Sequence, residues 1–168
     1  MKTNLNYDMF VPTRTLFGAG TLNELHAQPM PGRKALLVIS NGRSTRANSY
    51  LSRTEEQLRM AGVETVLFDR VEANPLKSTV MAGGAMAREN GCDMIVALGG
   101  GSVMDAAKAI AVVASNGGDY WDYIPCGTGK GKAVAETPLP IVAITTTAGT
   151  GSETDAGCVI TNAETHEK

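Results

Sequence analysis

Short, largely apolar runs alternate along this chain with helix-like stretches, and this alternation constrains the fold more than any other feature. The runs lie at residues 35–39, 64–68, 94–98 and 141–144, and small or polar residues follow most of them. Strands that carry apolar side chains on both faces are typical of parallel sheets covered by helices. The sequence therefore predicts an α/β fold, Rossmann-like, with a parallel sheet and helices on both of its faces.

The stretches between these runs have the features of helices. Residues 44–61 place apolar side chains at roughly helical spacing, and Gly62 is suited to end a helix. Two more helices are predicted over 77–90 and 103–114. Gly83 and Gly84 lie inside the first of these, where each glycine costs about 1 kcal/mol relative to alanine. We therefore expect close packing against a neighbour at this pair.

The remaining segments are predicted to be irregular. Residues 116–136 have no sustained periodicity and read as a helix end and a long surface loop, with a short helical turn at 119–124. Residues 1–20 are expected to be extended. Residues 159–168 resemble one arm of a hairpin that turns at 162–163.

Composition excludes several classes of protein. The 168 residues are 43% hydrophobic and 19% charged, as in a soluble globular domain. A net charge of −2 argues against a nucleic-acid surface. No apolar run approaches the roughly 20 residues of a membrane span, and residues 1–10 lack the pattern of a secretory leader. Neither a nucleic acid nor a membrane is therefore predicted as a partner.

Cysteine and histidine usage limits the kinds of site that the chain can build. Cys92, Cys126 and Cys158 are odd in number and far apart, which excludes a zinc ribbon and argues against a disulfide scaffold. A reducing, cytoplasmic location is therefore expected. His26 and His166 are the two histidines in the sequence, so a histidine-rich metal site cannot be built from this chain alone.

A glycine-rich loop is the strongest candidate for ligand binding. Gly99-Gly100-Gly101-Ser102 directly follows the apolar run 94–98 and precedes a predicted helix. Glycines let a backbone approach a phosphate closely, and a helix N-terminus offers free N–H groups and partial positive charge. Met104 occupies the third glycine position of the GxGxxG fingerprint, which is therefore incomplete. A ligand-free alternative is a tight turn with a capping box between Ser102 and Asp105.

A second loop, residues 146–152, strengthens the case for a phosphate-containing ligand. It follows the run 141–144 and consists almost entirely of threonine, glycine and serine. Hydroxyl groups at a second strand end suit hydrogen bonds to phosphate and ribose oxygens. Residues 127–132 also look like a phosphate loop, but they lack the GxxxxGK[ST] spacing and precede no predicted helix. We interpret them as a solvated loop.

Two segments together resemble the iron-containing alcohol dehydrogenase family. They are Gly-Gly-Gly-Ser-Val-Met-Asp-Ala-Ala-Lys at 99–108 and Thr-Thr-Ala-Gly-Thr-Gly-Ser-Glu at 146–153. The resemblance implies an N-terminal half that binds NAD(P) and an all-helical half that supplies a divalent metal. Residues 1–168 would then be the NAD(P)-binding N-terminal domain of a truncated protein, and the helical metal-binding domain would be absent from this chain.

The resemblance also implies which residues bind the cofactor. From the pyrophosphate toward the adenosine these are Gly100, Gly101, Ser102, Thr146, Thr147, Thr150 and Asn74. Lys168 matches a family lysine that reaches the cofactor ribose. Asp105 and Lys108 belong to the family signature, and Asp105 is included among the candidate cofactor-binding residues.

The loop after the first apolar run bears on the choice of cofactor. Family members that prefer NAD tend to carry an acidic residue there, which binds the ribose 2′-hydroxyl and repels a 2′-phosphate. Here the loop is Ser40-Asn41-Gly42-Arg43, with no carboxylate and with Arg46 nearby. We therefore expect NADP in preference to NAD.

The main hypothesis is that the full-length protein is an NAD(P)-dependent oxidoreductase that acts on small alcohols or aldehydes. Its divalent metal, iron or zinc, is expected only in the full-length enzyme, so no catalytic residue is assigned in this chain and the fragment alone should be inactive. The alternative is a non-catalytic dinucleotide-binding module. A third hypothesis is a dimerisation module, in which a homodimer forms through the N-terminal segment or through apolar surface bared by the absent half.

Overall fold

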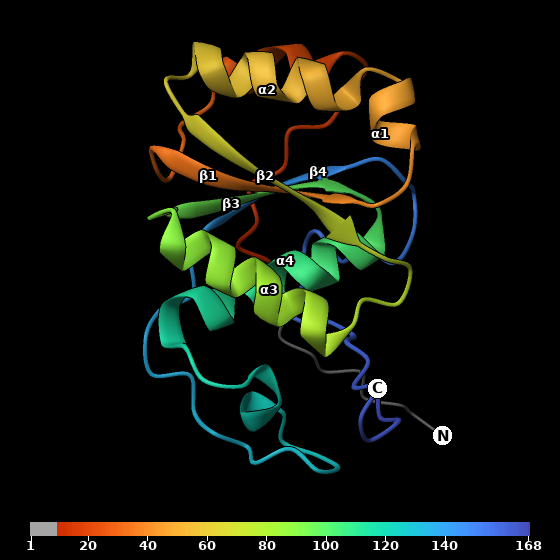
Figure 1. Ribbon diagram of the computed structural model, residues 1–168. Coiled ribbons are helices and arrows are strands. Elements are labelled where there is room, and N and C mark those ends of the chain that lie inside the picture. The colour runs from red at the N-terminus through yellow and green to blue at the C-terminus, as the bar shows by residue number, and fades with distance from the viewer. Residues whose placement is uncertain (1–9) are drawn as a thin grey trace, which may run out of the picture.

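The structure is a computed structural model that describes residues 10–168, and the predictions for residues 1–9 lie outside the described part. A four-stranded sheet with the order β2-β1-β3-β4 forms its centre (Figure 1). The strands are β1 (Lys34–Ser40), β2 (Glu64–Val71), β3 (Met94–Gly99) and β4 (Ile141–Thr145). Every strand pair is parallel, which confirms the predicted fold.

Helices cover both faces of the sheet (Figure 1). On one side lie α1 (Ser44–Ala47) and α2 (Tyr50–Met60), with the 3₁₀ helix η1 (Thr21–Ala27) against α2. On the other side lie α3 (Lys77–Glu89) and α4 (Gly101–Asn116), followed by the 3₁₀ helix η2 (Tyr120–Tyr123). None of the helices in residues 10–168 has the length and apolar character needed to cross a membrane.

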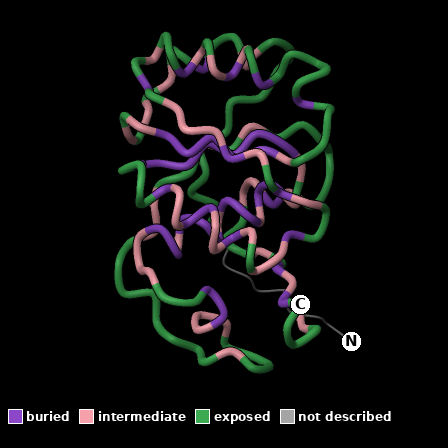
Figure 2. Tube along the Cα trace, viewed as in Figure 1, coloured by how far each residue is buried: buried purple, intermediate pink, exposed green. Residues whose placement is uncertain are grey.

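The core consists of two layers separated by the sheet. Leu36 and Val38 of β1 pack with the cluster beneath α3 and α4, whereas Leu37 and Ile39 pack with the cluster beneath α2. Figure 2 shows the buried residues concentrated along the central strands and the helix turns that face them. This alternation explains why residues 35–39 of β1 are apolar at every position, because each of their side chains meets one of two helical layers.

The paired glycines of α3 allow close packing against α4, as predicted. A Cβ atom on Gly84 would lie 2.6 Å from Val113 Cγ1 and 2.9 Å from Val113 Cβ. A Cβ atom on Gly83 would lie 2.5 Å from Ile110 Cδ1. The cost in helix propensity is therefore offset by an approach of the two helices that no larger residue permits.

The prediction of one continuous helix over 44–61 is wrong. The segment divides into α1 and α2 because Ser49 adopts a left-handed backbone conformation with φ 58°. Asn48 contributes to the break, since its side-chain amide donates to the Ser44 carbonyl oxygen at 2.9 Å.

Other boundaries also differ from expectation. Strand β2 continues to Val71, and α4 begins at Gly101, two residues earlier than predicted. The predicted hairpin arm over 159–168 is not a regular strand: Thr161 forms an isolated parallel bridge with Leu76, and Asn162 forms an antiparallel bridge with Glu167. The C-terminal segment is therefore a short turn docked beside the start of α3.

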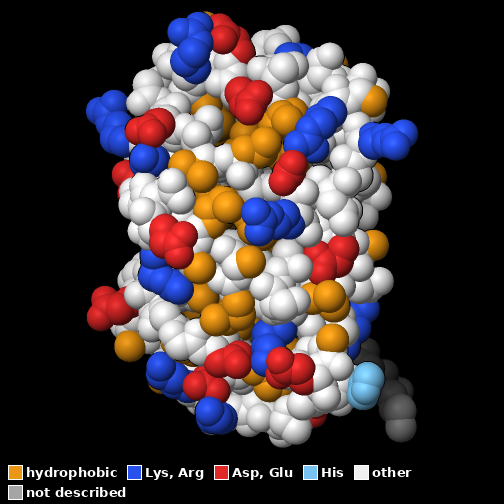
Figure 3. All heavy atoms as spheres, viewed as in Figure 1, with side chains coloured by type: hydrophobic (Ala, Val, Ile, Leu, Met, Phe, Trp, Pro, Cys, Tyr) orange, Lys and Arg blue, Asp and Glu red, His pale blue; other side chains and the backbone are white. Residues whose placement is uncertain are grey.

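Strand β2 forms one edge of the sheet. Figure 3 shows hydrophobic side chains in a band between α2 and α3 on this face, with charged side chains interspersed. On β2 itself, Asp69 forms an ion pair with Arg46 at 2.6 Å, and Arg70 lies over the ring of Phe68. Charged side chains of this kind discourage pairing of an edge strand with other chains.

Residues 127–132 are anchored rather than freely solvated. Glu167 accepts hydrogen bonds from the backbone N–H of Thr128 at 2.9 Å and from the Thr128 hydroxyl. The indole N–H of Trp121 donates to Thr128 Oγ1 at 3.0 Å and to Glu167 Oε2 at 3.3 Å. Trp121 is 7% exposed and belongs to the core.

Replacing Gly84 by alanine tests the helix contact. We expect Gly84→Ala to destabilise the chain by about 1–3 kcal/mol through overpacking, although alanine favours a helix. Urea unfolding gives the free energy, and Ala85→Gly on the same helix isolates the propensity contribution. The double variant Gly84→Ala, Val113→Ala should recover part of the loss, and no recovery would contradict the packing explanation.

Acid titration tests the anchor of the 127–132 loop. Hydrogen bonds from Thr128 and Thr165 hold the pKa of Glu167 below its ordinary value. The anchor is therefore present at neutral pH and is lost as the pH falls through this lowered pKa. Trp121 is the one tryptophan in the sequence, so its fluorescence should change with a midpoint below about pH 4.3.

The variant Glu167→Gln should abolish this fluorescence transition, because the amide does not titrate. Far-UV circular dichroism over the same pH range shows whether the fold stays intact. An unchanged transition in the variant would contradict the assignment to Glu167.

Candidate functional site

The strand order creates a switch point at the carboxyl edge of the sheet. From β1 the chain moves outward to β2, and from β3 it moves outward in the opposite direction to β4. Ligands of open parallel sheets bind at this kind of reversal, beyond the carboxyl ends of the strands. The loops that follow Ser40 and Gly99 flank the reversal here.

The structure brings the glycine loop (residues 99–102) and the threonine loop (residues 146–150) together. The backbone N–H of Thr146 donates to the Gly99 carbonyl oxygen at 2.9 Å. A Cβ atom on Gly100 would lie 3.0 Å from Thr147 Oγ1, and one on Gly101 would lie 3.9 Å from Thr150 Oγ1. Two loops about 50 residues apart in sequence thus form one surface, and all five residues of the threonine loop are exposed.

The N-terminus of α4 opens onto this surface. Gly100 is its N-cap residue, and no side chain caps the helix. A 16-residue helix presents unpaired N–H groups and partial positive charge at this end. The arrangement suits a phosphate or another oxyanion.

The alternative reading of Ser102 and Asp105 as a capping box is wrong. Ser102 lies within the first turn of α4, and the carboxylate of Asp105 is directed to a different segment. Its Oδ1 accepts from Ser152 Oγ at 2.6 Å, and its Oδ2 accepts from the backbone N–H of Val159 at 3.1 Å. The physical reason is that helix α4 starts one residue before Ser102, so its cap position is a glycine.

Sequence reasoning missed the partners of this part of α4. Lys108 and Asp105 both bind the segment that follows the threonine loop, through Ser152, Asp155 and Gly157. The one available signal was the spacing of Asp105 and Lys108, since residues three apart lie on the same face of a helix.

Asn74 and Lys168 also come together, although they are far apart in sequence. Asn74 follows β2 with a left-handed backbone, φ 56°, and its Oδ1 accepts a hydrogen bond from Lys168 Nζ at 2.7 Å. Both side chains belong to exposed residues. The resemblance assigned both to the cofactor, and the structure places them side by side at the carboxyl edge.

The loop after β1 forms a third group at the same edge. The backbone N–H of Asn41 donates to the Val71 carbonyl oxygen at 2.8 Å, which holds the loop against the end of β2. Ser40 is partly buried, whereas Asn41, Gly42 and Arg43 are exposed. No hydrogen bond within residues 10–168 joins this group to the threonine loop or to Asn74.

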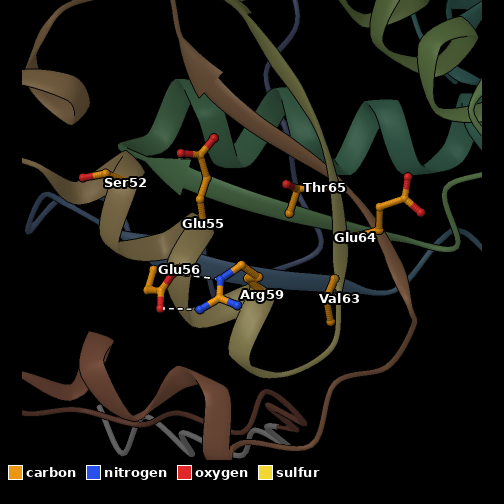
Figure 4. Close-up of a pocket in the computed structure, with 7 residues that line it drawn as sticks. All are labelled: Ser52, Glu55, Glu56, Arg59, Val63, Glu64 and Thr65. Carbon is orange, nitrogen blue, oxygen red and sulfur yellow. Dashed lines mark hydrogen bonds and ion pairs between the residues drawn. The ribbon is translucent and has the colours of Figure 1, made fainter.

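A surface hollow lies near the amino end of β2, away from the carboxyl ends of the strands. Figure 4 shows it between α2 and the start of β2, where Glu56 and Arg59 form an ion pair at 2.8 Å. Its lining residues are Ser52, Glu55, Glu56, Arg59, Val63, Glu64 and Thr65. None of them is a predicted site residue, and the hollow is remote from the loops at the carboxyl ends of the strands.

His26 and Cys158 have hydrogen-bond partners within the fold. Within residues 10–168 there is no cluster of three or more His, Cys, Asp or Glu side chains that could hold a metal ion. His26 instead binds Gln57, with Nδ1 2.7 Å from Oε1. Burial raises the pKa of the Cys158 thiol, whose Sγ lies 3.1 Å from the Tyr120 hydroxyl, so the thiol is protonated at neutral pH.

Comparison with known proteins identifies relatives of this chain. Among curated relatives, 1,3-propanediol dehydrogenase of Klebsiella pneumoniae is 39% identical, over 96% of this chain and 41% of its own length. The probable NADH-dependent butanol dehydrogenase 1 of Bacillus subtilis is 38% identical, over 97% of this chain and 41% of its own length. The chain thus spans about two fifths of the length of these relatives.

Solved structures agree with these relatives. The alcohol dehydrogenase of an archaeal halo-thermophile from a Red Sea brine pool, bound to NZQ, has a TM-score of 0.86 and 38% identity. The match covers 95% of this chain and 41% of that structure. Residues 12–168 match the family described as iron-containing alcohol dehydrogenase. The chain therefore belongs to the iron-containing alcohol dehydrogenase family.

Proposed function

We propose that residues 1–168 form the NAD(P)-binding N-terminal domain of a metal-containing dehydrogenase that interconverts small alcohols and aldehydes. The observation that carries the proposal is the hydrogen-bonded junction of the glycine and threonine loops at the N-terminus of α4. The names of the two curated relatives, a propanediol and a butanol dehydrogenase, support the substrate class.

The residues present fit a dinucleotide. Gly100 and Gly101 leave room for a pyrophosphate to approach the start of α4, where a Cβ atom on Gly100 would meet Thr147. Ser102 and the hydroxyls of Thr146, Thr147 and Thr150 would donate to phosphate and ribose oxygens. Asn74 would lie near the adenosine end, and Lys168 would reach the cofactor ribose. When bound, the nicotinamide supplies or accepts the hydride.

The divalent metal implied by the family, iron or zinc, has no donor set within residues 10–168. No step of the reaction is therefore assigned to this chain's own residues. The proposal is that this chain alone binds the dinucleotide without turning over alcohol.

The loop after β1 favours NADP. Ser40, Asn41 and Gly42 carry no charge, and Arg43 is exposed with no ion pair to any residue in the described part of the chain. Arg46 is engaged by Asp69 at 2.6 Å, so Arg43 is the better candidate to meet a 2′-phosphate. The Bacillus relative is named as NADH-dependent, which makes NAD the alternative.

Two further parts of the proposal concern surroundings and partners. A cytoplasmic location is supported by the three cysteines, all of which are free thiols. A homodimer is supported by Phe10 and Phe17, which are 85% and 96% exposed. The alternative function is a non-catalytic dinucleotide-binding module. It would bind the same dinucleotide, but its natural protein would have no helical metal-binding half.

Calorimetric titration of the 168-residue chain with NADPH and with NADH tests the site and its preference. We expect micromolar binding that is tighter for NADPH. Arg43→Gln should weaken NADPH binding about tenfold, roughly 1.4 kcal/mol, and leave NADH binding unchanged within about twofold. The matched control is Arg33→Gln, because Arg33 directly precedes β1 and lies at the amino ends of the strands.

Tighter binding of NADH, or equal weakening of both nucleotides by Arg43→Gln, would contradict the NADP assignment. Absence of binding to either nucleotide by a chain with native far-UV circular dichroism would contradict the proposed site.

A further inference from the structure

We propose that Lys108 is a positioning residue that holds the anchored loop, defined here as residues 151–159, against α4 and thereby fixes the threonine loop beside Gly100 and Gly101. The consequence for dinucleotide binding rests on the proposed function. The ordering of the loop is a property of this chain with or without a ligand.

Lys108 directs all of its hydrogen-bonding capacity to this one loop. Its Nζ donates to Ser152 Oγ at 2.9 Å, to Asp155 Oδ1 at 2.9 Å and to the Gly157 carbonyl oxygen at 2.5 Å. A lysine ammonium has three N–H donors, and all three are satisfied here. The side chain is 15% exposed, so this is a held ammonium group and not a solvated surface lysine.

Asp105 extends the contact to both ends of the anchored loop. It precedes Lys108 by three positions on the same face of α4 and binds Ser152 and Val159. The Ser152 hydroxyl accepts from Lys108 and donates to Asp105, and this serine is 5% exposed. Hydrogen bonds to charged groups are stronger than neutral ones, so the chain Lys108–Ser152–Asp105 is a firm attachment.

This attachment limits the freedom of the threonine loop. Thr146 is bound to Gly99 of β3, and Ser152 is bound to α4 six residues later. The residues between them are exposed except Gly151, and Thr147 and Thr150 are the ones that adjoin the glycine loop. With one end released, these residues would sample more backbone conformations, and binding would have to order them again.

Separate contacts hold the residues that follow Gly157. The Tyr120 hydroxyl lies 3.1 Å from Cys158 Sγ, and Ile160 is 3% exposed within the core. These anchors lie beyond the contacts of Lys108. Loss of the ammonium group should therefore loosen residues 146–157 locally without unfolding the domain.

Hydrogen–deuterium exchange of the unliganded 168-residue chain tests the ordering directly. In Lys108→Met, we expect amides of residues 146–157 to exchange at least about tenfold faster, with α3 and β1 unchanged. Lys108→Arg should restore part of the protection, because a guanidinium keeps the ion pair with Asp155. The control is Lys34→Met, which removes another partly buried lysine in an ion pair, at 29% side-chain exposure, from the amino end of β1.

Titration of the same variants with NADPH and NADH gives the second measurement. Lys108→Met should lower the affinity for the nucleotide that the wild type binds by about tenfold, while Lys34→Met should leave this affinity unchanged. Unchanged exchange in Lys108→Met would overturn the proposal, and so would faster exchange with unchanged affinity. If Lys108→Met does not fold, Asp155→Asn removes the negative charge of the ion pair with Lys108 and should give the same changes at smaller size.

The outcomes separate this proposal from the proposed function. A wild-type chain that binds neither nucleotide would refute the proposed function, and the exchange of residues 146–157 would then decide the positioning role of Lys108 alone.

Discussion

Strands β1 and β3 are buried on both faces, and this constraint determines where everything else in the molecule can lie. The side chains from Ala35 to Ile39 and from Met94 to Leu98 are all 0% exposed. Polar groups placed within such strands would lose their hydration without finding partners. Polar side chains that could bind a ligand are therefore excluded from the interior of these two strands, and the parallel arrangement gathers the loops that follow the strands at one edge of the sheet.

The elements that depend on local pattern were predictable from sequence. The apolar runs predicted the strands, and Gly83-Gly84 predicted close packing of α3, which the structure shows against α4. The break at Ser49 was not predictable, because a serine with positive φ leaves no mark in the apolar periodicity. The capping-box alternative for Asp105 arose because a carboxylate three residues after a serine satisfies the capping pattern. Its real partners lie 47 and 54 residues away, and no spacing rule reaches that far.

The candidate site shows the same division between local and distant information. Glycines and threonines at strand ends marked the loops correctly, since the two clusters directly follow β3 and β4. The pairing of Asn74 with Lys168 and the binding of Arg46 by Asp69 arise only when distant segments meet. The second of these changes which arginine is available near the loop after β1, so charge counted along the sequence overstated the positive potential there.

The contact between α3 and α4 has a consequence for how this surface responds to a ligand. The Val113 and Ile110 side chains of α4 pack directly against the Gly84 and Gly83 backbone of α3, which leaves little free space for a tilt or a slide. Any displacement of α4 would therefore carry α3 with it, and α3 is itself tied to the C-terminal turn through Lys77 and Glu164. The N-terminus of α4 is consequently a fixed platform, and adaptation to ligands of different shape falls to the polar loop opposite it.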